Sequence, residues 1–194
     1  LAGAASAAAA GQTQGALQQE AAAGQGLADA QELFFDLTQL LEVAVVGQAQ
    51  VVEIASSEAE AIAAAREEYV PLAQEIERKN LERAVRLAEL LDRERAEKIA
   101  AAQAAVAQAN EAGAAQAVGP DGEALPDAVA LETQRFDLAD QLLALGEAAM
   151  REAEVALDTS PLDWAMAGEA AERSRARLED LQTLFFSLVE HLKK

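Results

Sequence analysis

The chain has few side chains that could act as a nucleophile or as a base at neutral pH. Histidine occurs once, at His191, and cysteine does not occur. An HExxH zinc motif and the paired Glu-x-x-His motifs of di-iron bundles both need more histidines than this. Glu190 and Lys193 flank His191 near the end of a predicted helix, where an imidazole interacts with the helix dipole. We therefore expect no histidine-based catalytic or metal centre.

Carboxylates are the other groups that could hold a metal ion. The pairs Glu94/Glu97 and Asp137/Asp140 are each three residues apart on predicted helices, a spacing that could serve Mg²⁺ or Ca²⁺. With 34 acidic residues in the chain, such pairs also arise by chance. The glycine-containing loop at 119–122 includes a proline and an aspartate, which do not suit a phosphate nest. We predict no enzyme activity, no cofactor and no metal site.

The charge of the chain limits its partners. Fifteen bases against 34 acids give 15 − 34 = −19, a balance that repels nucleic acid and anionic lipid. No uninterrupted apolar run reaches the ~18 residues that span a bilayer, so direct membrane insertion is not expected. The expected partners are other proteins, a second copy of this chain included.

The first segment, residues 1–26, is rich in Ala, Gly and Gln. Residues 1–10 resemble the end of a secretory signal with an Ala-x-Ala cleavage site, which favours export to a periplasm or beyond. A low-complexity tail on a cytoplasmic protein fits the same composition.

The remaining residues, 27–194, are predicted to form a single helical bundle. Apolar residues recur in steps of three and four from Leu27 to Tyr69, with Gln48 and Glu58 the only polar positions of the seam. That repeat is typical of a long helix packed lengthwise on other helices. Similar patterns predict three further helices, and the four predicted ranges are about 27–69, 72–116, 128–157 and 161–192.

Two capping patterns support these boundaries. Asp127 can cap the third helix after the Gly- and Pro-rich loop that precedes it. Ser160 before Pro161, with Asp163 three residues after Ser160, resembles a capping box for the fourth helix. The short link between the third and fourth helices predicts an antiparallel hairpin.

Pro71 leaves two arrangements open. The favoured one is an all-α, elongated up-down four-helix bundle, in which the longer first and second helices project together as a coiled-coil tip over residues 58–84. The alternative is one long helix bent at Pro71, with the hairpin of the third and fourth helices packed on it.

Large aromatic side chains mark the candidate contact sites. Up-down order would place all five phenylalanines in one layer, which is either core or an apolar pocket or dimer seam at the open end. The single tryptophan is either a staple near the hairpin turn or a partner anchor. The candidate residues are Phe34, Phe35, Phe136, Trp164, Phe185 and Phe186.

Long seams without reactive groups favour a non-enzymatic structural or scaffolding protein that acts through protein–protein contacts, as a component of a larger envelope assembly for example. The alternative is a sensory helical-bundle domain of a membrane receptor with a small ligand between its helices. An apolar-ligand carrier is a third interpretation of the same pattern.

Overall fold

The computed structural model describes residues 23–24, 26–27, 30–57, 65–111 and 127–185, and the chain divides into two compact units, Leu1–Asp36 and Leu37–Lys194. In the first unit, residues 30–32 are helical and a turn follows. Phe34 N–H donates to Gln31 O at 3.0 Å and Phe35 N–H donates to Glu32 O at 3.2 Å. These bonds span three residues instead of four, so the prediction of an unbroken helix from residue 27 is wrong.

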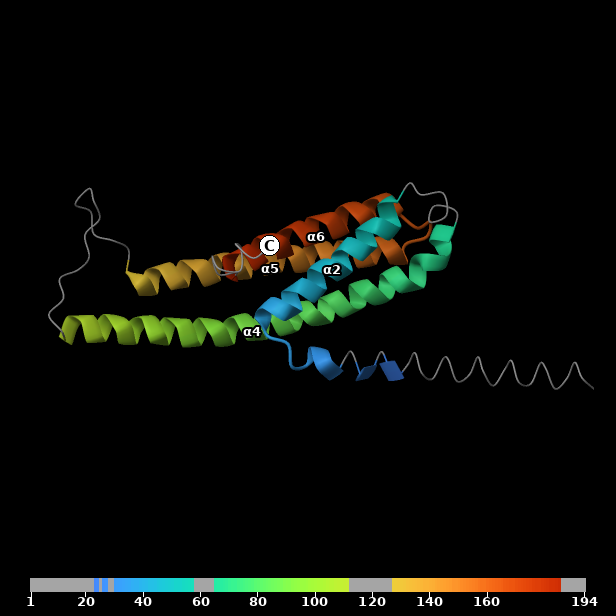
Figure 1. The fold of residues 1–194 in the computed structure, drawn as a ribbon. Helices are drawn as coiled ribbons and strands as arrows, with labels where there is room; N and C mark the ends of the chain where they lie inside the picture. The colour runs from blue at the N-terminus through green and yellow to red at the C-terminus, as the bar shows by residue number, and fades with distance from the viewer. Residues whose placement is uncertain (1–22, 25, 28–29, 58–64, 112–126, 186–194) are drawn as a thin grey trace, which may run out of the picture. The chain divides into compact units, whose positions relative to one another are not determined.

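The second unit is an up-down bundle of four long helices (Figure 1). α2 packs on α4 and α6, and α5 packs on the same two helices, so the four form a closed ring. The described residues contain no strand. The all-α bundle is therefore confirmed, and its elements are α2 (Leu37–Ser56), the short 3-10 helix η1 (Arg66–Tyr69), α4 (Val70–Glu111), α5 (Ala128–Asp158) and α6 (Trp164–Phe185).

The seam predicted for the first helix is the buried face of α2. Inside this helix every seam position is buried, because steps of three and four keep the residues on one side of a helix. Those positions are Leu37, Leu41, Ala44, Gln48, Val51 and Ala55.

The chain reverses between Ser56 and Val70, before the proline that was expected to bend or turn it. Arg66 Nη2 donates to the backbone oxygen of Ser57 at 2.5 Å, which satisfies a carbonyl left open at the end of α2. Pro71 is the second residue of α4, where a missing N–H costs no helical bond. The long bent helix is therefore wrong, and so is the predicted end of the first helix at Tyr69.

The longer pair of helices is not the predicted one. Residues 73–84 lie inside the bundle, where Ala73, Glu77, Asn80 and Ala84 are buried. The helices that project are α4 and α5, at the opposite end of the unit (Figure 1). We call residues 96–111 of α4 and 128–135 of α5 the arm, and the rest of the second unit the body. The predicted tip is misplaced because the first helix was predicted to end at Tyr69, whereas α2 ends at Ser56.

The two capping predictions have different outcomes. Asp127 Oδ1 accepts from Val129 N–H at 3.1 Å, as expected for the start of α5. The cap of α6 is Asp163, whose Oδ1 accepts from Met166 N–H at 2.9 Å, rather than Ser160. α6 therefore begins three residues later than predicted, and the antiparallel hairpin of α5 and α6 is confirmed.

One described helix, α2, is long and apolar enough to cross a membrane by length and composition. Core helices of bundles pass the same test, and α2 contributes nine buried residues to the bundle, Gln48 among them. The expectation of no membrane insertion stays a prediction.

Candidate functional site

Two of the predicted aromatic residues meet where the body ends and the arm begins. Phe136 is fully buried, and its ring centroid lies 5.6 Å from that of Phe185. Arg135 lies over both rings, with its guanidinium carbon 4.6 Å from the Phe185 centroid and 5.6 Å from that of Phe136. Arg95 of α4 lies 5.9 Å from the Phe136 centroid. This cluster closes the end of the apolar core with cation–π contacts.

The other predicted phenylalanines lie outside the described part of the second unit. Phe34, which is 87% exposed, and Phe35, which is half-buried, belong to the first unit. Phe186 and His191 lie outside the described residues. Of the predicted layer of five phenylalanines, the structure therefore describes only the contact of Phe136 with Phe185. A partner role for Phe34 stays a prediction.

Trp164 is half-buried at the other end of the body. Its side chain packs against a buried apolar cluster to which all four helices contribute, consisting of Ile54, Ala73, Ala156, Leu157 and Ala167. The guanidinium carbon of Arg66 lies 6.0 Å from the centroid of its ring. Trp164 therefore serves as core on one side and as a wall of the adjoining pocket on the other.

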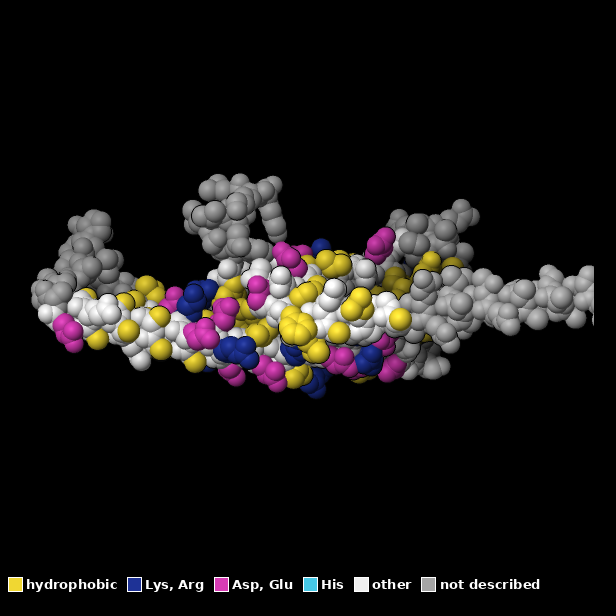
Figure 2. All heavy atoms as spheres, turned by 60° about the horizontal axis from the view of Figure 1, so that its bottom comes forward, with side chains coloured by type: hydrophobic (Ala, Val, Ile, Leu, Met, Phe, Trp, Pro, Cys, Tyr) yellow, Lys and Arg dark blue, Asp and Glu magenta, His cyan; other side chains and the backbone are white. Residues whose placement is uncertain are grey.

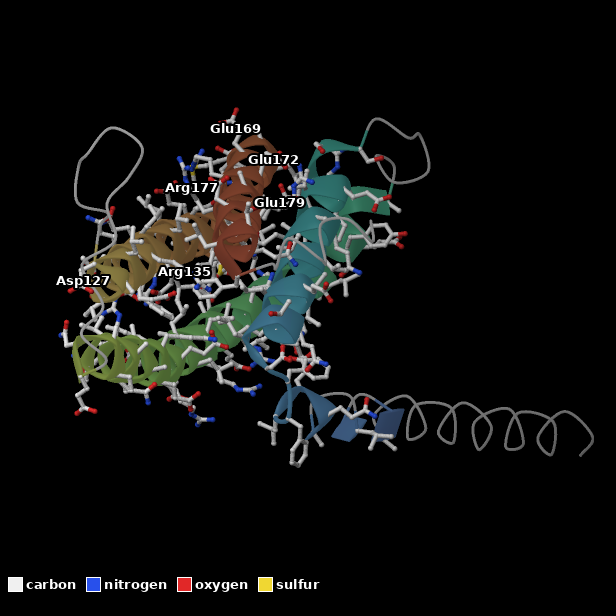
Figure 3. The ribbon with its side chains drawn as sticks, turned by 60° about the vertical axis from the view of Figure 1, so that its left-hand side comes forward. Asp127, Arg135, Glu169, Glu172, Arg177 and Glu179 are labelled. Atoms are coloured by element: carbon white, nitrogen blue, oxygen red, sulfur yellow. The ribbon has the colours of Figure 1, made fainter. Side chains whose placement is uncertain are left out.

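That pocket has a volume of about 890 Å³ and lies between the end of α2, Arg66 and the start of α6. Val52, Ala55 and Gly168 contribute its apolar wall. Glu169 and Glu172 line it from α6, where Figure 3 shows them on neighbouring turns. Two acids and two arginines line the pocket, so it has no net formal charge; the remaining residues are Ser56, Ala165 and Arg173.

The carboxylate pair at Asp137 and Asp140 is occupied by a cation from the protein itself. Arg95 Nη2 donates to Asp137 Oδ1 at 3.1 Å and to Asp140 Oδ2 at 2.6 Å, which ties α4 to α5. In the described part of the chain no three metal-ligating side chains lie together. The pair at Glu94 and Glu97 is therefore not joined there by further ligands.

Among the residues that the structure describes, the core of the body contains four polar side chains that are completely buried: Gln48, Glu77, Asn80 and Ser174. We call them the polar layer. Gln48 Nε2 donates to Glu77 Oε2 at 2.9 Å, and Arg83 Nη1 donates to Asn80 Oδ1 at 2.8 Å. Burial raises the pKa of Glu77 from 4.5 to about 7, the bond from Gln48 opposes this rise, and the charge of Glu154 adds to it.

The sequence predicted only the first member of the polar layer, as a polar position in the seam. Glu77 and Asn80 occupy the same three-and-four spacing as Ala73, Ala84 and Leu87, which could have placed them on the buried face. They were missed because that stretch alternates in charge, and charged side chains are rarely buried without an ionic partner.

The outer surface of α5 carries a row of exposed leucines. Leu131, Leu138 and Leu145 are seven residues apart and are 50%, 44% and 55% exposed. Glu152 lies seven residues after Leu145 and forms an ion pair with Arg173 of α6. The leucine row therefore follows the side of α5 that faces α6, just outside their contact.

Comparisons with protein-family models, with curated proteins and with solved structures found no match.

Proposed function

We propose that this protein is a non-enzymatic scaffold that binds another protein along the leucine row of α5. The observation that supports this proposal is that α5 has two apolar stripes, only one of which is used by the core. Phe136, Leu143 and Met150 are buried, whereas the leucine row at the same seven-residue spacing is about half exposed. A row of this spacing suits a partner helix with its own apolar stripe.

The charges around the leucine row favour a basic partner. α5 contains seven acidic residues and two arginines, a formal charge of −5. Glu132 and Glu152 lie one residue and seven residues from members of the row. A partner helix flanked by Lys and Arg would gain attraction over this surface, and the attraction would weaken with salt.

The test is crosslinking and co-purification from the native source with three tagged forms of the protein. We expect the wild type to recover a partner that Leu138→Ser/Leu145→Ser loses. Val85→Ser is the matched control, because Val85 is 58% exposed on α4 and lies outside the row. Sedimentation of the purified protein decides whether the partner is a second copy. Equal recovery with all three forms, or no partner with any of them, would contradict the proposal.

The second candidate function is a sensory bundle with a small ligand between its helices, which the pocket beside Trp164 favours. A volume of about 890 Å³ falls in the range of small-molecule sites. Its apolar wall and its balanced charges suit a compact molecule with an apolar part and both an acidic and a basic group.

Trp164 is the only tryptophan and lines this pocket, so its fluorescence reports on an occupant. The probe is free phenylalanine, which carries these three groups, titrated while the emission of Trp164 is recorded. We expect a saturable change that Ala165→Phe abolishes by filling the pocket, whereas Ala176→Phe on the exposed side of α6 preserves it. An unchanged emission at millimolar probe would exclude this ligand class.

A further inference from the structure

The polar layer of the body is a set of side chains with open hydrogen-bonding positions. Of its members, Glu77 Oε1, Gln48 Oε1, Asn80 Nδ2 and Ser174 Oγ are buried and have no hydrogen-bond partner among the described residues. A buried polar atom without a partner destabilises a fold by about 1–3 kcal/mol.

The helices bring these residues to one level of the bundle. Gln48 of α2 bonds directly to Glu77 of α4. A Cβ on Gly168 of α6 would lie 3.1 Å from the Cβ of Ala55, which places these two residues side by side. Gln48 precedes Ala55 by seven residues, and Ser174 follows Gly168 by six, so in antiparallel helices they lie at about the same height.

A glycine makes room for this layer. A Cβ at Gly47 would lie 2.7 Å from Asn80 Oδ1 and 2.8 Å from Asn80 Nδ2. Both distances are shorter than van der Waals contact, so any larger residue at position 47 would displace the buried amide. The close approach of α2 and α4 at this point is therefore built around polar side chains.

The surroundings of Glu77 disfavour the charged form of its carboxyl group. Among the described residues it makes no ion pair, and its one hydrogen bond comes from the neutral amide of Gln48 on α2. From α5 the charged group that acts on it is Glu154, which has the same sign. On α4 itself, Arg83 directs Nη1 to Asn80 instead.

One proton would satisfy two of the open atoms. Glu77 and Gln48 each end in a planar group with two polar atoms. One atom of each is already bonded, since Gln48 Nε2 donates to Glu77 Oε2. The remaining two atoms, Glu77 Oε1 and Gln48 Oε1, are both acceptors while the carboxylate is ionised. They therefore cannot bond to each other, and both are without a hydrogen-bond partner. A hydrogen on Glu77 Oε1 turns that atom into a donor and closes the acid–amide ring.

We propose that Glu77 and Gln48 form a proton-binding site in the core of the bundle, in which a proton from solvent resides on Glu77 Oε1 and is donated to Gln48 Oε1. The site makes the packing of α2 on α4 depend on pH near neutrality, a property beyond the proposed scaffold function.

The sign of the effect follows from the two ends of the titration. The folded protein binds this proton with a pKa of about 7, against 4.5 for an ordinary glutamate. The stability it contributes is complete below about pH 4.5, falls as the pH rises toward 7 and is gone above it. The interval corresponds to roughly 300-fold in the folding equilibrium constant.

Glu77→Gln tests the proposal because a second amide forms the same ring without a proton. We expect Glu77→Gln to fold more favourably than wild type at pH 8, by 10-fold to 300-fold in urea denaturation. At pH 4.5 the two should agree within a few fold. Glu89→Gln is the matched control, since it removes the same charge from an exposed position of α4 and should show a difference that barely changes with pH.

A direct measurement separates protonation from a general gain in stability. Carbon-13 NMR of the Glu77 side-chain carboxyl should show a midpoint between pH 6 and 8 in the wild type. A midpoint below pH 5, or a Glu77→Gln effect equal at pH 4.5 and pH 8, would overturn the proposal.

Discussion

The body and the arm are made from the same two helices and yet are held together in different ways. In the body α4 and α5 each have two neighbouring helices, and large side chains such as Leu87, Leu91 and Phe136 are fully buried. In the arm α4 and α5 extend past α2 and α6 (Figure 1), apart from the contact of Arg135 with the Phe185 ring of α6, and none of the described side chains there is buried. The number of neighbouring helices, and not helix-forming tendency, therefore decides where a core exists.

Composition follows the same division. From Ile99 to Asn110 the arm has no charged residue and is mostly alanine, which Figure 2 shows as a pale projecting end beside the charged surface of the body. Alanine contributes little apolar surface that packing could bury, so burial stabilises this stretch only weakly. The high helix propensity of alanine stabilises the helix here instead. At about 1.5 Å per residue, residues 96–111 extend about 24 Å.

The largest expected effect lies where the two regions meet. Phe136→Ala should lower the free energy of unfolding by about 3–5 kcal/mol, because it empties the end of the core and removes the ring contact with Phe185. Urea denaturation followed by circular dichroism measures the loss. Leu138→Ala, two residues along on the exposed surface of α5, is the control and should cost less than about 1 kcal/mol. Similar losses for the two would mean that the leucine row is covered.

A matched pair of truncations on α4 compares the two regions directly. Leu91→Ala in the body should cost about 2–5 kcal/mol, since Leu91 is 1% exposed. Ile99→Ala in the arm should cost less than about 1 kcal/mol, because Ile99 is only half-buried and alanine favours the helix. The same denaturation experiment measures both. A cost for Ile99→Ala as large as that for Leu91→Ala would contradict the distinction between arm and body.

Opposite exchanges of glycine and alanine give the smallest expected effects. Gly47→Ala in the body should cost about 1–2 kcal/mol, since the clash with Asn80 outweighs the better helix propensity. In an Asn80→Ala background the same change should stabilise the fold by up to about 1 kcal/mol. Ala104→Gly in the arm should cost about 1 kcal/mol at most, seen as faster amide hydrogen exchange confined to the arm. A stabilising Gly47→Ala in the wild type would show that Asn80 has room to move.

Much of the body could be predicted from spacing. The apolar seam of α2, the cap at Asp127 and the α5–α6 hairpin depend on contacts within a few residues, which a sequence displays directly. The end of α2 could not be predicted, because apolar spacing continues past Ser56 while the chain turns.

The candidate sites were harder to predict than the fold. Spacing alone assigns Leu138 and Phe136 to equivalent stripes of α5, and only the positions of α4 and α6 decide which of the two is buried. The burial of Glu77 has the same origin, since its environment comes from Gln48 and Glu154 on other helices. The pocket beside Trp164 likewise depends on where three separate segments meet.

The ion pairs of Arg95 with Asp137 and Asp140 affect how α4 and α5 can move apart. If α4 separates from α5 starting in the arm, the separation reaches the ion pairs of Arg95 with Asp137 and Asp140 close to the buried ring of Phe136. We therefore expect the separation of the two helices to stop at Arg95. At high salt, which screens these charges, it should extend further into the body.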